Sequence, residues 1–227
     1  MSNYPEYTSV NQISQQEFFS RVIGYLGVGV GLNAVGAFFG SYLMPLVGNA
    51  YMFIMIILLL GQLALSFALG RNLESKPTST VRTQFIIYSL IMGLTISWIF
   101  EVYTDGSILF AFVTSAVVFI SLSVIGRTTK VDLSRFGSLL FFGLLSCIIV
   151  SLLNLFIFRT SMMELVMAYV ETLLFMGLIA YDAQMIERYY SGTDNENYAI
   201  FAALQLELDF VNLFLRILSI FGKNKDD

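Results

Sequence analysis

The sequence predicts an all-α membrane protein, a polytopic bundle of seven transmembrane helices. Of its 227 residues, 57% are hydrophobic and only 12% are charged, and the mean hydropathy is +0.77. Soluble domains have about 25% charged residues, so this composition excludes an ordinary soluble globule. The apolar segments reach the roughly 20 residues that a spanning helix needs. They are longer than membrane-barrel strands, and lipid cannot satisfy an open strand edge, which leaves helices.

Seven segments have the length and composition of a spanning helix. They cover residues 22–43, 46–70, 83–101, 106–126, 136–158, 162–184 and 198–221. The connections between them are short, so no second domain fits. We therefore expect one transmembrane domain over residues 1–227, with a polar N-terminal tail at about 1–20.

Two loops divide the longest apolar stretches. Met44-Pro45 and Gly48-Asn49 separate the first span from the second, because proline lacks an amide hydrogen and a Gly-Asn pair suits a turn. Thr104-Asp105-Gly106 predicts a tight turn between the third and fourth spans.

Basic residues set the expected orientation. One side of the bundle is flanked by Arg21, Arg71, Lys76, Arg82, Arg127, Lys130, Arg135 and Arg188, and the other by Arg159, Lys223 and Lys225. The positive-inside rule then places the N-terminus in the cytoplasm. Seven spans place the C-terminus outside the cytoplasm, although the two basic residues of the tail favour the cytoplasmic side. A re-entrant or tilted last helix would instead return the tail to the cytoplasm.

Composition also excludes several classes of function. The formal charge of −4 provides no basic patch, so nucleic acid is not an expected partner. The chain has no histidine, which removes zinc-protease motifs and histidine-based triads. Cys147 is the single cysteine and lies in an apolar segment, so an internal disulfide is excluded and a packing role is favoured.

Two aspartates lie inside the last two apolar segments, Asp182 in AYDAQMI and Asp209 in LELDFVNLF. Asp182 precedes Asp194, in the connecting turn 191–197, by 12 residues, and Asp209 follows it by 15. At a rise of about 1.5 Å per residue, the two carboxyl groups lie within roughly 5 Å of equal depth. A charge inside a spanning helix is costly and usually lines an ion or proton path. We therefore expect the pair to face each other and to carry the function.

Further polar residues follow the same faces of these helices. Gln205, Asp209, Asn212 and Arg216 are four, three and four residues apart, which places them on one face of the last span. Glu171 lies 11 residues before Asp182, close to three helical turns, and so faces the same way. A polar stripe on an apolar helix indicates a buried central helix beside a hydrated groove. The alternative is that these groups only specify packing.

The residues AYDAQMI at 180–186 and ALQLELDFVNLFLRILSIFG at 203–222 resemble the sixth and seventh helices of the Bax inhibitor-1 family. The resemblance implies a seven-helix bundle with the last helix at the centre. It also implies a pH-sensitive calcium leak controlled by an aspartate pair, here Asp182 and Asp209. It further implies a latch in the closed state between the first aspartate and an arginine near the end of the second helix. That arginine would be Arg71, with Arg82 as the alternative. Glu207 departs from the family pattern, where an uncharged residue is expected.

The chemistry of such a leak follows from carboxylates in contact. They cannot both ionise easily in a low-dielectric site and titrate as a coupled pair. When both are charged, an arginine such as Arg71 pins the helices together, and protonation weakens that link. Calcium prefers oxygen ligands, and Asp182 and Asp209, with Glu171, Gln205 and Asn212 along the path, supply candidates. No cofactor is expected beyond calcium as the transported ion, and the lipid bilayer is the expected surrounding.

Two other functions stay open. Intramembrane aspartyl proteases use a Tyr-Asp in one helix and an Asp in the next, so Tyr181-Asp182 resembles half of that signature, but Leu206-Glu207-Leu208 lacks the glycines of the second half. A non-transporting regulator that binds membrane protein partners leaves no motif. We expect no enzymatic activity. The tail KNKDD carries no endoplasmic-reticulum retrieval signal, so a bacterial plasma membrane is the expected location.

Overall fold

The computed structural model describes residues 14–189 and 195–226, and within these ranges the chain is helical, without a β-strand. The α-helices are α1 (Gln15–Leu43), α2 (Tyr51–Gly70), α3 (Thr78–Ile96), α4 (Ile99–Val102), α5 (Asp105–Thr128), α6 (Gly137–Leu153), α7 (Ser161–Tyr189) and α8 (Glu196–Phe221). Shorter helical segments are η1 (Met44–Ala50), η2 (Leu133–Phe136) and η3 (Asn154–Phe158).

Seven stretches among the described residues are long and apolar enough to cross a membrane, which confirms the predicted class. The second span begins at Tyr51 rather than at residue 46, because Pro45 and a left-handed Gly48 (φ 51°) hold η1 apart from α2. The first begins earlier than predicted, at Gln15, so the polar tail ends sooner than expected. There Phe18 is buried, while Glu17 and Arg21 pair at 3.0 Å on the exposed face.

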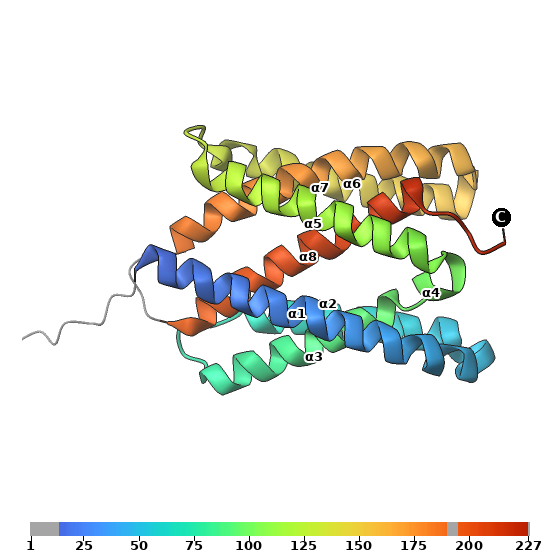
Figure 1. Ribbon diagram of the computed structural model, residues 1–227, viewed down its shortest axis with the longest axis horizontal. Helices are drawn as coiled ribbons and strands as arrows, with labels where there is room; N and C mark the ends of the chain where they lie inside the picture. Colours follow the sequence, from blue (N-terminus) through green and yellow to red (C-terminus); the bar gives the residue numbers. More distant parts are fainter. Residues whose placement is uncertain (1–13, 190–194, 227) are drawn as a thin grey trace, which may run out of the picture.

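Helix α8 lies at the centre of the bundle, as expected. It crosses obliquely between a layer of α1, α2 and α3 and a layer of α5, α6 and α7 (Figure 1). In its most apolar window 67% of the residues are buried, compared with 11% for the spans that contain α2 and α6. The buried leucines Leu204, Leu206 and Leu213 are at most 1% exposed. A helix surrounded by protein can carry polar side chains that lipid would not tolerate.

The α1–α3 contact depends on small residues. A Cβ on Gly93 would lie 2.2 Å from the carbonyl oxygen of Asn33, and one on Gly36 would lie 2.4 Å from that of Leu90. Both obstacles are backbone atoms, so neither can move aside cheaply. The two helices therefore pack at a distance that only glycine permits, as is common between helices in membranes.

One connection differs from the turn that the sequence predicts. Thr104 is the N-cap of α5 and accepts a hydrogen bond from the Ser107 amide at 3.4 Å, so Asp105 and Gly106 begin the helix and do not form a tight turn. An acidic residue in the first turn of a helix interacts favourably with the helix dipole. Of the predicted turn 191–197, residues 191–194 lie outside the described part of the chain, and Asn195 caps α8.

The C-terminal tail packs against the α4–α5 connection. The Thr104 amide donates to the Lys223 carbonyl at 3.1 Å, and the Lys225 amide donates to the Val102 carbonyl at 2.9 Å. The tail therefore lies at the end of the bundle opposite the start of α8. Helix α8 runs through the whole bundle, and the re-entrant alternative is wrong (Figure 1).

Candidate functional site

The carboxyl groups of Asp182 on α7 and Asp209 on α8 lie within hydrogen-bonding reach of each other. Asp209 is 6% exposed and Asp182 is partly buried. The antiparallel arrangement of α7 and α8 brings them to the same depth, as the count from the connecting turn predicts. Two ionised carboxylates are both acceptors, so a hydrogen bond between them requires one shared proton.

The aspartate pair lines a large cavity. Its volume is about 960 Å³, and it lies among α2, α3, α6, α7 and α8. It extends from Tyr51, at the start of α2, to Ser66 near the other end of that helix. Gln205 and Asn212 line it together with Asp182 and Asp209. The predicted polar face of the last span thus contributes three of its four residues to one hollow space.

The fourth residue of that face, Arg216, forms an ion pair with Glu171. The distance between Arg216 Nε and Glu171 Oε2 is 2.8 Å, and the Ser151 hydroxyl donates to Glu171 Oε1 at 3.1 Å. Glu171 is 6% exposed, so its charge is largely removed from solvent. The sequence correctly placed Glu171 and Asp182 on one face, and the structure gives each its own partner on α8.

The structure does not bring Arg71 to the aspartate pair. Arg71 is exposed at the C-cap of α2, and no ion pair reported for the described residues joins it to Asp182. Arg82, the alternative, is engaged elsewhere: it contacts Glu196 Oε2 at 2.6 Å and the Tyr25 hydroxyl at 2.8 Å. Tyr25 in turn donates to Glu196, so these three residues join α1, α3 and α8.

The end of the bundle that holds the α2–α3 loop is closed. We call it the basic end, because Arg71, Lys76 and Arg82 lie there. The Asn197 side chain donates to the carbonyl oxygens of Leu73 at 2.8 Å and Lys76 at 2.9 Å. Leu69 is fully buried, and the Phe201 ring packs against Gly70. The first turn of α8 therefore seals the α2–α3 loop against the bundle below the aspartate pair.

Glu207 is a buried acid. In the sequence it stands out only as a charged residue where the family pattern has an uncharged one. It is 0% exposed, and Ser89 donates to its Oε2 at 3.0 Å. Two residues correspond to about 200° around a helix, so Glu207 faces away from Asp209, toward α1 and α3. Gly29 leaves room for it, because a Cβ there would lie 2.4 Å from Glu207 Oε2. The sequence signal for this buried acid is the presence of a charged residue, Glu207, two positions before Asp209.

The site offers few ligands for a permanently bound metal. No group of three or more histidine, cysteine or acidic residues that could hold an ion occurs among the described residues. The cavity instead presents two carboxyl groups and the side-chain carbonyl oxygens of Gln205 and Asn212. Calcium takes six to eight oxygen ligands, so water would supply the others.

The described residues contain seven spanning helices, of which one, α8, is central and carries half of an aspartate pair. This arrangement defines a polytopic membrane protein with an ionisable site inside its bundle. Comparison with known families gives a more specific assignment. The family described as "Inhibitor of apoptosis-promoting Bax1" matches residues 15–226, and the chain belongs to this Bax inhibitor family.

Relatives of similar length occur in several bacteria. An inner membrane protein of Escherichia coli K12, YbhL, is 35% identical over 99% of this chain and 100% of its own length. An uncharacterized membrane protein of Streptococcus pyogenes serotype M1 is 35% identical with the same coverage. A protein of Borreliella burgdorferi is 36% identical over 94% of both chains. Together with the seven apolar helices, these relatives identify a bacterial integral membrane protein.

Proposed function

We propose that this protein is a pH-sensitive calcium leak channel gated by Asp182 and Asp209. The observation that carries the proposal is the contact between the two carboxyl groups in the lining of a large cavity. Acidic residues at bilayer depth are expensive to maintain and usually belong to ion or proton paths. The carbonyl oxygens of Gln205 and Asn212 in the same cavity are ligands that calcium accepts.

The pH sensitivity follows from the contact itself. Two adjacent carboxylates repel each other, and sharing one proton removes that repulsion. The observed arrangement, with the aspartates together and Arg71 exposed, corresponds to the pair that shares a proton. In the fully ionised state the second charge needs a cation, and Arg71 is the candidate latch. Protons and calcium then compete for the same oxygens.

Gating further requires the seal at the basic end to open. The cavity reaches the aspartate pair, while Asn197, Leu69 and Phe201 close the bundle below it. A movement of α2 would break the seal and would also change the position of Arg71, because the arginine directly follows α2. The latch and the seal therefore move with the same helix.

Paired aspartates that share a proton are also the catalytic groups of aspartic proteases. The Asp182–Asp209 contact therefore keeps an intramembrane protease as a second candidate. The two amide side chains beside the pair favour the channel, because they supply oxygen ligands that a protease does not need. A regulator that acts only through membrane protein partners would need neither carboxyl group in a cavity.

One reconstitution separates these functions. The purified chain is placed in phospholipid vesicles that contain a calcium indicator, together with a membrane-spanning test peptide. The channel predicts calcium entry that depends on pH, without cleavage of the peptide. Cleavage without calcium entry would identify a protease. The absence of both would contradict the channel and leave the regulator.

A further inference from the structure

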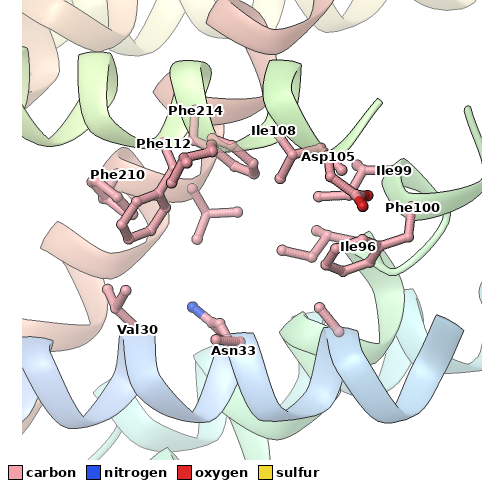
Figure 2. Close-up of a pocket in the computed structure, with 14 residues that line it drawn as sticks. Val30, Asn33, Ile96, Ile99, Phe100, Asp105, Ile108, Phe112, Phe210 and Phe214 are labelled. Carbon is pink, nitrogen blue, oxygen red and sulfur yellow. The ribbon is translucent and has the colours of Figure 1, made fainter. Parts of the chain in front are cut away.

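A second cavity lies on the other side of α8 from the aspartate pair. Its volume is about 340 Å³, and it is bounded by α1, α5, α8 and the α3–α4 region (Figure 2). The rings of Phe112, Phe210 and Phe214 form one wall, and Ile96, Ile99 and Phe100 lie at the other end. Its lining is apolar except at two residues, Asn33 and Asp105.

This cavity opens toward the lipid. Ala34 on α1 and Leu109 on α5 line it and are exposed, Leu109 by 64%. Both residues belong to spanning helices, Ala34 inside α1 and Leu109 four residues after the start of α5. A molecule dissolved in the bilayer can therefore reach the cavity between α1 and α5 without passing through water.

Asn33 is the feature that points to a ligand. The side chain is 4% exposed, its nitrogen lies within hydrogen-bonding reach of the Glu207 carboxyl group, and its amide oxygen has no hydrogen-bond partner. Figure 2 shows the amide directed into the cavity, with Phe112 and Phe210 across from it. A buried polar group without a partner costs about 1–3 kcal/mol. A ligand with a hydrogen-bonding group at this point would remove that cost.

We propose that this cavity binds a neutral lipophilic alcohol, with an apolar body between α1 and α5 and a hydroxyl group at Asn33. A hydroxyl group can donate to the amide oxygen, which has no partner in the protein. An engineered apolar cavity of about 150 Å³ binds benzene. The present volume of about 340 Å³ therefore suits a molecule with about 12 carbon atoms.

The surrounding charges exclude an anionic ligand. The Glu207 carboxyl group lies within hydrogen-bonding reach of the Asn33 side chain. Asp105 lines the opposite end of the cavity and points into it (Figure 2). A carboxylate at Asn33 would lie between these acidic residues, whereas a cation at this depth would carry the cost of a charge in lipid. A neutral hydroxyl group avoids both the repulsion by the acidic residues and the cost of a charge in lipid.

Photolabelling tests the site directly. The full chain in phospholipid vesicles is irradiated with a dodecanol that carries a diazirine in its chain, and the labelled peptides are mapped. We expect labelling of residues 30–37 on α1 and 105–112 on α5. At equal concentration in the membrane, 1-dodecanol should compete about tenfold better than dodecane, as one net hydrogen bond implies. Dodecanoate should compete weakly at alkaline pH.

Two variants with controls make the result decisive. Asn33→Leu keeps the volume but removes the amide, so dodecanol should lose its advantage over dodecane. Leu109→Trp narrows the opening and should reduce labelling, whereas Val117→Trp, at a similarly exposed position of α5 outside the cavity, should not. Labelling spread evenly over the lipid-facing helices, or unchanged in Leu109→Trp, would overturn the site. Equal competition by dodecane and dodecanol in the unmodified chain would overturn the role of Asn33.

Discussion

Glu171 on α7 and Arg216 on α8 are joined by an ion pair of 2.8 Å, seven residues along α8 from the Asp182–Asp209 contact. At about 1.5 Å per residue this places the ion pair about 10 Å from the aspartates, on the side away from the basic end. The two contacts have opposite properties. One neutralises a buried acid with a cation, and the other leaves two acids to share a proton.

Because Glu171 and Arg216 form an ion pair, we expect the effects of changing these two residues on stability to depend on each other. Arg216→Met should lower the free energy of unfolding by about 1–3 kcal/mol, because Glu171 stays buried without its cation. This range is below that of fully buried pairs because the arginine side chain is 38% exposed. Unfolding in detergent, followed by circular dichroism, measures the change.

The matching variant is the double change Glu171→Gln with Arg216→Met. It removes both charges and should recover most of the loss. Additive losses in the double variant would show that the two side chains do not interact in the membrane protein.

Gly29 should be essential because Glu207 occupies the space beside it. A Cβ at Gly29 would lie 2.4 Å from Glu207 Oε2 and 2.9 Å from the Phe85 ring. Gly29→Ala should therefore destabilise the protein by about 1–3 kcal/mol, as overpacking does. Gly31→Ala on the same helix is the control, because nothing lies within 4 Å of a Cβ there. Its effect should be neutral or slightly stabilising. Equal thermal stability of the two variants would contradict the close packing.

The seal at the basic end should control leakage independently of protonation. Asn197→Ala removes two hydrogen bonds to the α2–α3 loop, each worth about 0.5–1.5 kcal/mol. The variant should leak calcium faster at both acidic and alkaline pH. Flux from vesicles at the two pH values measures this. An increase confined to acidic pH would show that Asn197 acts through the aspartates and not through the seal.

The latch predicts an effect of Arg71 that depends on pH. Arg71→Ala should raise calcium leakage at mildly alkaline pH, where the ionised pair needs a cation, and should change it little at mildly acidic pH. Arg82→Ala instead breaks contacts with Tyr25 and Glu196, so it should lower thermal stability. If Arg82→Ala raises the alkaline leak and Arg71→Ala does not, the latch residue is misassigned.

The sequence predicted the features that depend on distance along a helix. The equal depth of Asp182 and Asp209 follows from counting residues on two consecutive antiparallel helices, and the shared face of Gln205, Asp209 and Asn212 follows from helical periodicity. Both need only the geometry of α7 and α8. The seven spans followed from apolar length alone.

Features that depend on how distant helices are rotated against each other were not predictable. Glu207 is accommodated by Gly29 and Ser89, which are far away in the sequence. The position of Arg71 depends on the α2–α3 loop, which helical periodicity does not describe. The cavity at Asn33 lies between α1, α5 and α8, and no single segment encodes how these helices are placed.

The most direct test of the channel is the pH profile of calcium flux for Asp209→Asn in reconstituted vesicles. The amide keeps the shape of the side chain and donates a hydrogen bond to Asp182 without titrating, so it imitates the pair that shares a proton. Glu164→Gln is the control, because this exposed acid lies in the first turn of the same helix as Asp182. We expect a pH-dependent flux in the unmodified chain and in Glu164→Gln. In Asp209→Asn we expect a flux that no longer responds to pH. An unchanged pH profile in Asp209→Asn would contradict the aspartate pair as the sensor.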